Sequence, residues 1–147
     1  MRLSKGSLRW ESLADRVNIF ALHTSLYRLL GGRLVGRNIL ILTTTGRKSG
    51  RRRSTPLFYV RDGSDHVIVA SNGGEDPYPG WWHNIRADAR VEIQVGRQVI
   101  PCSAEPVRED GAAELWEKLC AVYGGYRDYK ERTKRELTIF RLKPLSE

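Results

Sequence analysis

Apolar residues recur at spacings of three and four between residues 8 and 30, and Gly31 and Gly32 follow directly. This spacing predicts an amphipathic helix, because residues three and four apart lie on one helical face, and the glycine pair predicts its end. We therefore expect an N-terminal amphipathic helix within residues 1–32 and a folded core over residues 33–147.

Short runs of β-branched and apolar residues predict strands in the next part of the chain. Residues 38–45 (NILILTTT) form the first run and stop at a glycine, so we expect a strand that enters a turn. Residues 53–60 and 66–71 flank the turn sequence DGSD at residues 62–65. This arrangement predicts that the two segments pair as a hairpin.

The second half of the chain alternates helical and strand signals. A Gly/Pro-rich loop precedes residues 80–87, which we expect to form a short helix. Residues 91–95 and 98–107 predict a second hairpin around Gly-Arg. A further helix is predicted over residues 110–122, with Asp110 as its N-cap.

The order of these elements predicts the fold class. A last strand over residues 137–142 follows the helices, and hairpins outnumber β-α-β units, which favours an antiparallel barrel of the α+β class. No repeat and no Pro/Gly/Ser linker divides the 147 residues, a length within the ~100 to 200 residues that one core commonly serves. We therefore expect one domain, residues 1–147.

Composition limits the location and the metal chemistry. No apolar run approaches the ~20 residues needed to cross a bilayer, and charges interrupt the N-terminal stretch where a signal peptide is apolar, so we expect a cytoplasmic protein. The two cysteines, Cys102 and Cys120, and the three histidines, His23, His66 and His83, have no metal-ligand spacing. We expect no metal site.

The net charge of +8 is concentrated in one loop, where five of the seven residues 47–53 are basic. Residues 43–57 (TTTGRKSGRRRSTPL) combine glycines, which let backbone N–H groups approach an anion, with hydroxyls and cations. The sequence therefore suits a phosphate, although it is neither a Walker loop nor a dinucleotide fingerprint. A solvated hairpin tip explains the same composition, and both interpretations stay open at this point.

Two aromatic segments add candidate chemistry. In residues 71–84 (SNGGEDPYPGWWHN), paired tryptophans follow a Gly/Pro-rich loop and either pack a planar ring or fill the core. In residues 123–129 (YGGYRDY), three tyrosines at intervals of three either line a pocket with apolar walls and O–H donors or pack against the barrel.

In combination, these motifs resemble a known family. The string TTTGRKSG with Arg53 and Pro56-Leu57 after it, S-x-G-G ahead of P-x-W-x-x-N, and Y-x-x-Y-x-x-Y occur in this order. They are similar to the deazaflavin-dependent nitroreductase and quinone reductase family of actinobacteria, over about residues 26–144. The resemblance implies a mainly antiparallel split β-barrel of the FMN-binding-protein kind, with the helices packed on it. It also implies coenzyme F420, a hydride carrier with a phosphodiester and an anionic oligoglutamate tail.

The resemblance also implies the site residues. The segments that match the family's cofactor contacts are Arg47, Lys48, Ser49, Arg53, Ser54, Thr55, Pro56, Leu57, Phe58, Val69, Ala70, Ser71, Asn72, Gly80, Trp81, Trp82, His83 and Asn84. The residues that match its acceptor pocket are Tyr123, Tyr126 and Tyr129. For the group that donates a proton or stabilises developing charge, we place Tyr126 first, followed by Tyr129 and Ser71.

The implied function is an F420H2-dependent reductase that passes a hydride to a quinone, a nitroaromatic or a conjugated enone. A second hypothesis keeps the fold and changes the cofactor to FMN or haem. A third is a non-enzymatic nucleic-acid-binding barrel, but we expect no nucleic-acid partner because the charge lies in one loop without a recognised motif. Monomer and homodimer stay open. Two alternatives also stay open for the N-terminal helix. It either contacts a membrane surface, which would give the protein a membrane-associated location, or packs on the barrel.

Overall fold

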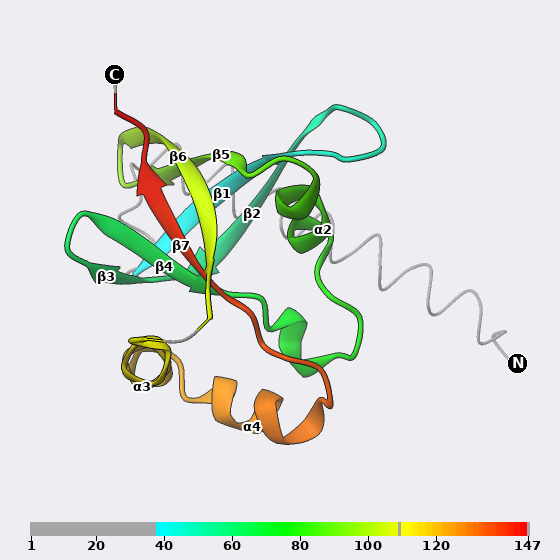
Figure 1. The fold of residues 1–147 in the computed structure, drawn as a ribbon, viewed down its shortest axis with the longest axis vertical. Coiled ribbons are helices and arrows are strands. Elements are labelled where there is room, and N and C mark those ends of the chain that lie inside the picture. The colour runs from blue at the N-terminus through cyan, green and yellow to red at the C-terminus, as the bar shows by residue number, and fades with distance from the viewer. Residues whose placement is uncertain (1–37, 109, 147) are drawn as a thin grey trace, which may run out of the picture.

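The computed structural model describes residues 38–108 and 110–146 of the chain. Within these residues, seven antiparallel strands form one sheet curled into a half-barrel, accompanied by three α-helices and a 3-10 helix (Figure 1). The strands are β1 (Ile39–Thr45), β2 (Arg52–Phe58), β3 (Val60–Asp62), β4 (Asp65–Val69), β5 (Arg90–Val95), β6 (Gln98–Val107) and β7 (Ile139–Pro144). The helices are η1 (Asn72–Gly74), α2 (Gly80–Ala87), α3 (Ala112–Val122) and α4 (Gly125–Arg132). The predicted α+β class with a mainly antiparallel sheet is confirmed.

The connection between β2 and β3 accounts for the curl. The strand order is β2-β1-β5-β6-β7-β4-β3, so β2 and β3 stand at opposite ends of the sheet, yet only Tyr59 separates them in the chain. A chain that leaves one edge and enters the other after one residue requires the two edges to lie close together. The backbone N–H of Tyr59 donates to the Asn38 carbonyl at 2.9 Å and holds this crossing against the start of β1.

The antiparallel pairing predicted across the turn at residues 62–65 is confirmed, but the prediction of one strand over residues 53–60 is wrong. β2 pairs along its whole length with β1, and only the three residues of β3 pair with β4. The composition of both segments favours extended backbone, but composition and alternation do not specify which neighbour a strand pairs with. The tertiary closure of the sheet divides the run at Tyr59.

Other predicted elements agree more closely with the structure. The hairpin around residues 96–97 is confirmed, since β5 and β6 pair antiparallel across this turn, and the helix over residues 80–87 is α2. The N-cap of α3 is Gly111 in the left-handed region (φ 85°), without a side-chain cap, so the prediction of Asp110 as the N-cap is wrong. Glycine takes this conformation without steric cost, and Asp110 lies one position too early. The last strand begins and ends two residues later than predicted, at Ile139 and Pro144.

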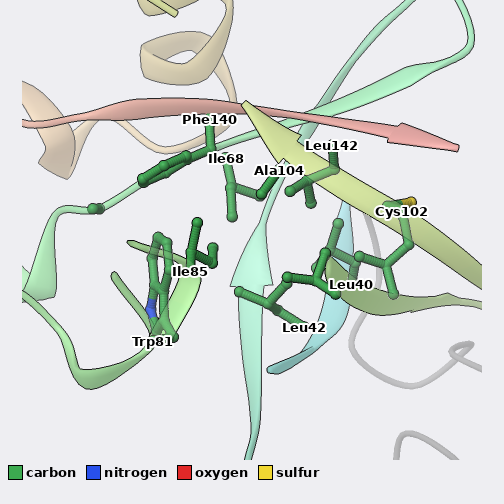
Figure 2. Close-up of a cluster of buried hydrophobic side chains, with 12 residues drawn as sticks. Leu40, Leu42, Ile68, Trp81, Ile85, Cys102, Ala104, Phe140 and Leu142 are labelled. Atoms are coloured by element: carbon green, nitrogen blue, oxygen red, sulfur yellow. The ribbon is translucent and has the colours of Figure 1, made fainter. Parts of the chain in front are cut away.

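The curled sheet and α2 enclose a cluster of buried apolar side chains (Figure 2). Leu40 and Leu42 of β1 and Leu142 of β7 are at most 1% exposed. Trp81 and Ile85 of α2 pack into the same cluster. Because burial of one large apolar side chain contributes about 1.5–3 kcal/mol, these two residues anchor α2 to the barrel.

A second apolar cluster lies between the sheet and α3. Leu115 and Leu119 of α3 pack with Val67 and Val69 of β4, whereas Ile68 belongs to the first cluster. Successive side chains of a strand point to opposite faces, so both faces of β4 are covered. This explains why residues 67–70 (VIVA), in the second half of β4 and just after it, are continuously apolar rather than alternating.

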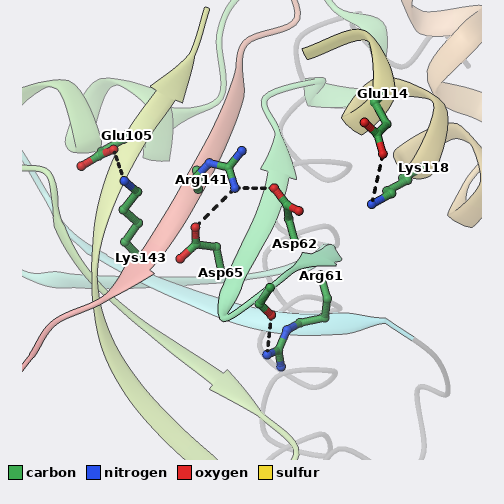
Figure 3. A network of polar contacts seen from close by, with 9 residues as sticks. Arg61, Asp62, Asp65, Glu105, Glu114, Lys118, Arg141 and Lys143 are labelled. Carbon is green, nitrogen blue, oxygen red and sulfur yellow. Dashed lines mark hydrogen bonds and ion pairs between the residues drawn. The ribbon is translucent and has the colours of Figure 1, made fainter. Parts of the chain in front are cut away.

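The short β3–β4 hairpin is tied to β7 by charge. Arg141 donates from Nη1 to Asp62 at 2.5 Å and to Asp65 at 3.3 Å (Figure 3). The Arg141 guanidinium holds the pKa of Asp62 below its usual value, chiefly through this hydrogen bond. The pair of contacts fixes the hairpin tip against the neighbouring strand.

The N-terminal helix predicted within residues 1–32 lies outside the described residues, as does its predicted contact with a membrane or the barrel. Among the helices of residues 38–108 and 110–146, none is long and apolar enough to cross a membrane.

Candidate functional site

A cavity of about 610 Å³ opens where the β1–β2 loop, β2, η1 and α2 meet. Figure 1 shows that the β1–β2 loop and α2 lie on the same side of the half-barrel. The described residues that line the cavity are Gly46, Arg47, Lys48, Ser49, Arg53, Thr55, Pro56, Leu57, Val69, Ser71, Asn72, Gly73, Pro79, Gly80, Trp81 and Asn84. The volume falls within the ~300 to 1,000 Å³ of typical cofactor pockets.

The cavity wall changes from charged to apolar along β2. Arg53, Thr55 and Leu57 all line it, as expected for alternate residues of one strand. At about 3.3 Å per residue, they span roughly 13 Å from a cation to an aliphatic side chain. No acidic residue is among the described lining residues. The wall therefore suits a ligand with an anionic end and an apolar end.

The basic loop is folded into a closed turn. Gly46 N–H donates to the Arg51 carbonyl at 2.7 Å, and Gly50 N–H donates to the Gly46 carbonyl at 2.8 Å. Gly50 has φ 69°, a left-handed conformation that glycine adopts without strain. The Ser49 hydroxyl accepts from Arg51 N–H at 3.1 Å, and its own proton stays available to an anion.

Two of the five basic residues at positions 47–53 do not line the cavity. Arg52 forms an ion pair with Glu92 of β5 at 2.8 Å, and Arg51 is exposed. The positive field of the loop nevertheless extends to α2. The pKa of His83 is lowered first by burial and then by nearby cations, among them Arg47.

Asn84 connects α2 to the basic loop. Its Oδ1 accepts from the backbone N–H of Arg47 at 3.0 Å, and its Nδ2 donates to the Thr44 hydroxyl at 3.0 Å. The side chain is 7% exposed. Asn84 therefore holds the loop that carries the cations, in addition to lining the cavity.

The η1 turn forms the opposite wall, and α4 supports it from behind. Asn72, Gly73 and Gly74 all have positive φ, at 46°, 64° and 80°. A Cβ added to Gly74 would lie 2.9 Å from the Tyr129 Cα, so the turn and α4 approach each other too closely for any other residue. Ser71 precedes this turn and faces the cavity.

The paired tryptophans have different environments, because adjacent residues of a helix point about 100° apart. Trp81 lines the cavity and packs edge-on against Phe140 in the core. Trp82 stacks on Tyr78 with ring centroids 3.8 Å apart and donates from Nε1 to Thr138 at 3.3 Å. Only Trp81 of the pair lies on the cavity wall.

The three tyrosines cluster together but do not line the cavity that the described residues form. The Tyr123 and Tyr129 hydroxyls lie 2.7 Å apart and share a hydrogen bond. Tyr126 is 5% exposed, and burial raises the pKa of its hydroxyl. Tyr123 also stacks on Phe58 of β2, with centroids 5.1 Å apart. Of the three residues predicted to supply a proton, Ser71 alone lies on the cavity wall.

Five of the residues predicted to contact the cofactor lie off this wall. They are Ser54, Phe58, Ala70, Trp82 and His83. Ser54 points to the other face of β2, where its hydroxyl lies 2.8 Å from that of Thr43, and Ala70 is fully buried in the core. Contiguous segments were predicted as units, whereas strand alternation and helical rotation turn part of each segment away.

Gly46, Gly73 and Pro79 line the cavity but are missing from the predicted site residues. Gly46 and Pro79 lie in loops and Gly73 lies in η1, and the glycine and proline content of these segments, which indicates turns, is the available signal. Within residues 38–108 and 110–146, no group of three His, Cys, Asp or Glu side chains is placed to hold a metal ion.

Comparison with known proteins gives concordant results. A family model described as F420H(2)-dependent quinone reductase matches residues 19–144. An F420H(2)-dependent quinone reductase of Mycobacterium tuberculosis is 37% identical over 140 residues, which cover 89% of this chain and 93% of that protein.

Solved structures show the same architecture. An F420-H2 dependent reductase has a TM-score of 0.67 and 32% identity, and the match covers 73% of this chain and 95% of that one. A structure described as a domain-swapped dimer has a TM-score of 0.69 and 29% identity, and the match covers 88% of this chain and 98% of that one. A haem storage protein of Vibrio cholerae has a TM-score of 0.57 at 15% identity, with 77% and 85% covered, which shows a shared fold only.

Proposed function

The chain belongs to the F420H(2)-dependent quinone reductase family, and we infer that it is an oxidoreductase that passes a hydride from reduced coenzyme F420 to a quinone. The family membership confirms the resemblance seen in the motifs. The observation that carries the inference for this chain is the cavity wall, which is cationic at Arg47, Lys48 and Arg53 and apolar at Leu57 and Trp81.

We also propose that the half-barrel is a split β-barrel of the FMN-binding-protein kind, supported by the fold shared with the haem storage protein.

The residues on the wall fit this coenzyme. Arg47, Lys48 and Arg53 would bind its phosphodiester, because charge-assisted hydrogen bonds are stronger than neutral ones, and Ser49 would add a hydroxyl donor. The apolar side chains beyond Thr55 would bind the ring system. The absence of acidic residues among the described lining residues removes repulsion from an anionic tail. When bound, the reduced deazaflavin supplies the hydride, and the protein supplies binding and orientation.

We propose Ser71 as the donor that stabilises negative charge on the acceptor oxygen. Its position on the cavity wall supports this role, whereas burial and a raised pKa make Tyr126 a weaker proton donor. A single well-placed donor of this kind is typically worth ~10²-fold or more in kcat. The roles of Tyr126 and Tyr129 in catalysis, and of Tyr123 in acceptor binding, stay predictions.

Other parts of the function stay predictions as well. We propose a quinone as the acceptor class, with nitroaromatics and enones as further substrates to be screened. A cytoplasmic location, peripheral membrane contact through residues 1–32, and a monomeric or homodimeric state are untested. FMN, haem and nucleic acid are not favoured as ligands, because the family match concerns F420H(2) and the structural likeness to the haem protein shows the fold alone.

The first experiment is a fluorescence titration of the purified protein with coenzyme F420, beside FMN in the same buffer. We expect saturable binding of F420 at micromolar concentration or below. A preference for FMN would contradict the cofactor assignment, and failure to bind either would contradict the proposed function.

The second experiment compares Ser71→Ala with Tyr126→Phe in turnover of a water-soluble quinone. We expect the serine variant to lose about 100-fold or more in kcat, and the tyrosine variant to lose less. A larger loss of kcat in Tyr126→Phe than in Ser71→Ala would instead favour Tyr126 as the proton donor.

A further inference from the structure

Arg135, in the segment between α4 and β7, binds four backbone carbonyls at once. Its Nη2 donates to Ser71 at 2.8 Å, and its Nη1 donates to Ala70 at 2.9 Å and to Glu136 at 3.1 Å. Its Nε donates to Glu75 at 3.1 Å. Three of these carbonyls lie on the two sides of the η1 turn, so one guanidinium joins the beginning of the turn to its end.

The η1 turn has few other internal constraints. Two backbone hydrogen bonds close it, from Gly74 N–H to the Ser71 carbonyl at 2.8 Å and from Glu75 N–H to the Asn72 carbonyl at 3.2 Å. Asn72 holds a left-handed conformation, which Asn adopts more readily than other residues with a side chain, and its Nδ2 donates to the Pro77 carbonyl at 2.8 Å. The planar, five-donor guanidinium of Arg135 is suited to hold such a turn from outside.

The environment of Arg135 is not that of an ordinary surface cation. Its guanidinium lies 4.6 Å from the ring centre of Tyr78, which in turn stacks on Trp82. Within residues 38–108 and 110–146, no carboxylate forms an ion pair with Arg135. Its charge interacts with carbonyl dipoles, with the Tyr78 ring and, without a direct ion pair, with Asp76.

We propose that Arg135 is a positioning residue that holds the Ser71–Gly73 wall in its binding shape without contacting the ligand. Arg135 does not line the cavity, whereas Ser71, Asn72 and Gly73 do. The clamp on the Ser71 carbonyl also sets where the Ser71 hydroxyl can point. This inference rests on the proposed function, since it concerns the affinity of the same cavity for coenzyme F420.

The test compares Arg135→Met and Arg135→Lys with a matched control, Arg132→Met. Arg132 lies three positions earlier, is exposed, and stacks on Tyr129 with 5.2 Å to the ring centre. The control therefore removes the same charge and the same kind of aromatic contact, but no hydrogen bond to the backbone of residues 70–75.

Hydrogen exchange without coenzyme is the first measurement. We expect faster exchange at the amides of Gly74 and Glu75 in Arg135→Met, a smaller change in Arg135→Lys, and none in Arg132→Met. Unchanged exchange in both Arg135 variants would overturn the clamp, whether or not the protein binds F420. If the methionine variant does not fold, Arg135→Lys provides the test. It keeps the positive charge and loses only the planar arrangement of guanidinium donors.

F420 titration at several salt concentrations is the second measurement. We expect the Kd to rise tenfold or more in Arg135→Met, with partial rescue in Arg135→Lys, and the dependence of Kd on salt to match that of Arg132→Met. A salt dependence weaker than in the control would show that Arg135 contacts the anion directly, and an unchanged Kd would show that the wall needs no clamp. Failure of the wild-type protein to bind would instead contradict the proposed function and leave the exchange result to decide on the clamp.

Discussion

Truncation of Asn84 should weaken both the fold and anion binding, because this side chain joins α2 to the basic loop. Asn84→Ala removes two hydrogen bonds of 3.0 Å, to Arg47 N–H and to the Thr44 hydroxyl. Thr44 is 2% exposed, so its hydroxyl cannot readily turn to water. At about 0.5–1.5 kcal/mol for each bond, with a further penalty for polar groups left without partners, the loss is about 2 kcal/mol of unfolding free energy.

Urea unfolding and F420 titration of the same variant measure the two effects. With an m-value of about 2 kcal/mol/M, the unfolding midpoint should fall by about 1 M. The Kd for F420 should rise several-fold, because the loop that carries Arg47 and Lys48 is no longer held against α2.

Gln94→Ala is the matched control. It removes one amide-to-carbonyl hydrogen bond, to Gly96 in the β5–β6 hairpin, and Gln94 does not line the cavity. We expect at most about 1 kcal/mol of destabilisation and an unchanged Kd. If Asn84→Ala lost stability but kept its affinity for F420, the hydrogen bonds between Asn84 and the basic loop would not matter for binding. If it lost affinity at full stability, Asn84 would act as a direct ligand contact.

Three further predictions concern charge and burial. Arg47→Gln and Lys48→Gln should each weaken F420 binding several-fold at low ionic strength, and the difference should shrink as salt is raised, in a titration series. Burial lowers the pKa of His66 below its ordinary 6.5, so the unfolded chain takes up the proton first. Stability should therefore be fully present above about pH 6.5 and fall below it, and urea midpoints of His66→Gln should lack this decline. Burial raises the pKa of Cys102 to about 11 and also raises that of Cys120, so neither thiol should react with iodoacetamide at pH 7.5 before unfolding, by mass spectrometry.

Local patterns in the sequence predicted much of the fold. The β5–β6 hairpin and α2 follow from turn residues and short-range periodicity, which act over a few positions of the chain. The basic loop was predicted for the same reason, because its glycines, hydroxyls and cations are contiguous. Arg47, Lys48 and Ser49 do line the cavity.

Long-range contacts decided what the local patterns left open. The division of the strand at Tyr59 depends on which edges of the sheet meet, and neither composition nor alternation contains that information. The two tryptophans look equivalent in sequence, but only the packing of α2 on the sheet determines which of them lines the cavity.

The sequence alone therefore determined the family, the antiparallel α+β class and the segments that meet at the cavity. Only the tertiary structure assigned the individual side chains: Ser71 to the wall, Tyr126 to a buried cluster behind it, and Arg135 to the back of η1. The physical reason is the separation of the partners along the chain, which is 37 residues for Asn84 and Arg47 and 64 for Arg135 and Ser71. Contacts at such distances exist only once the curled sheet has closed.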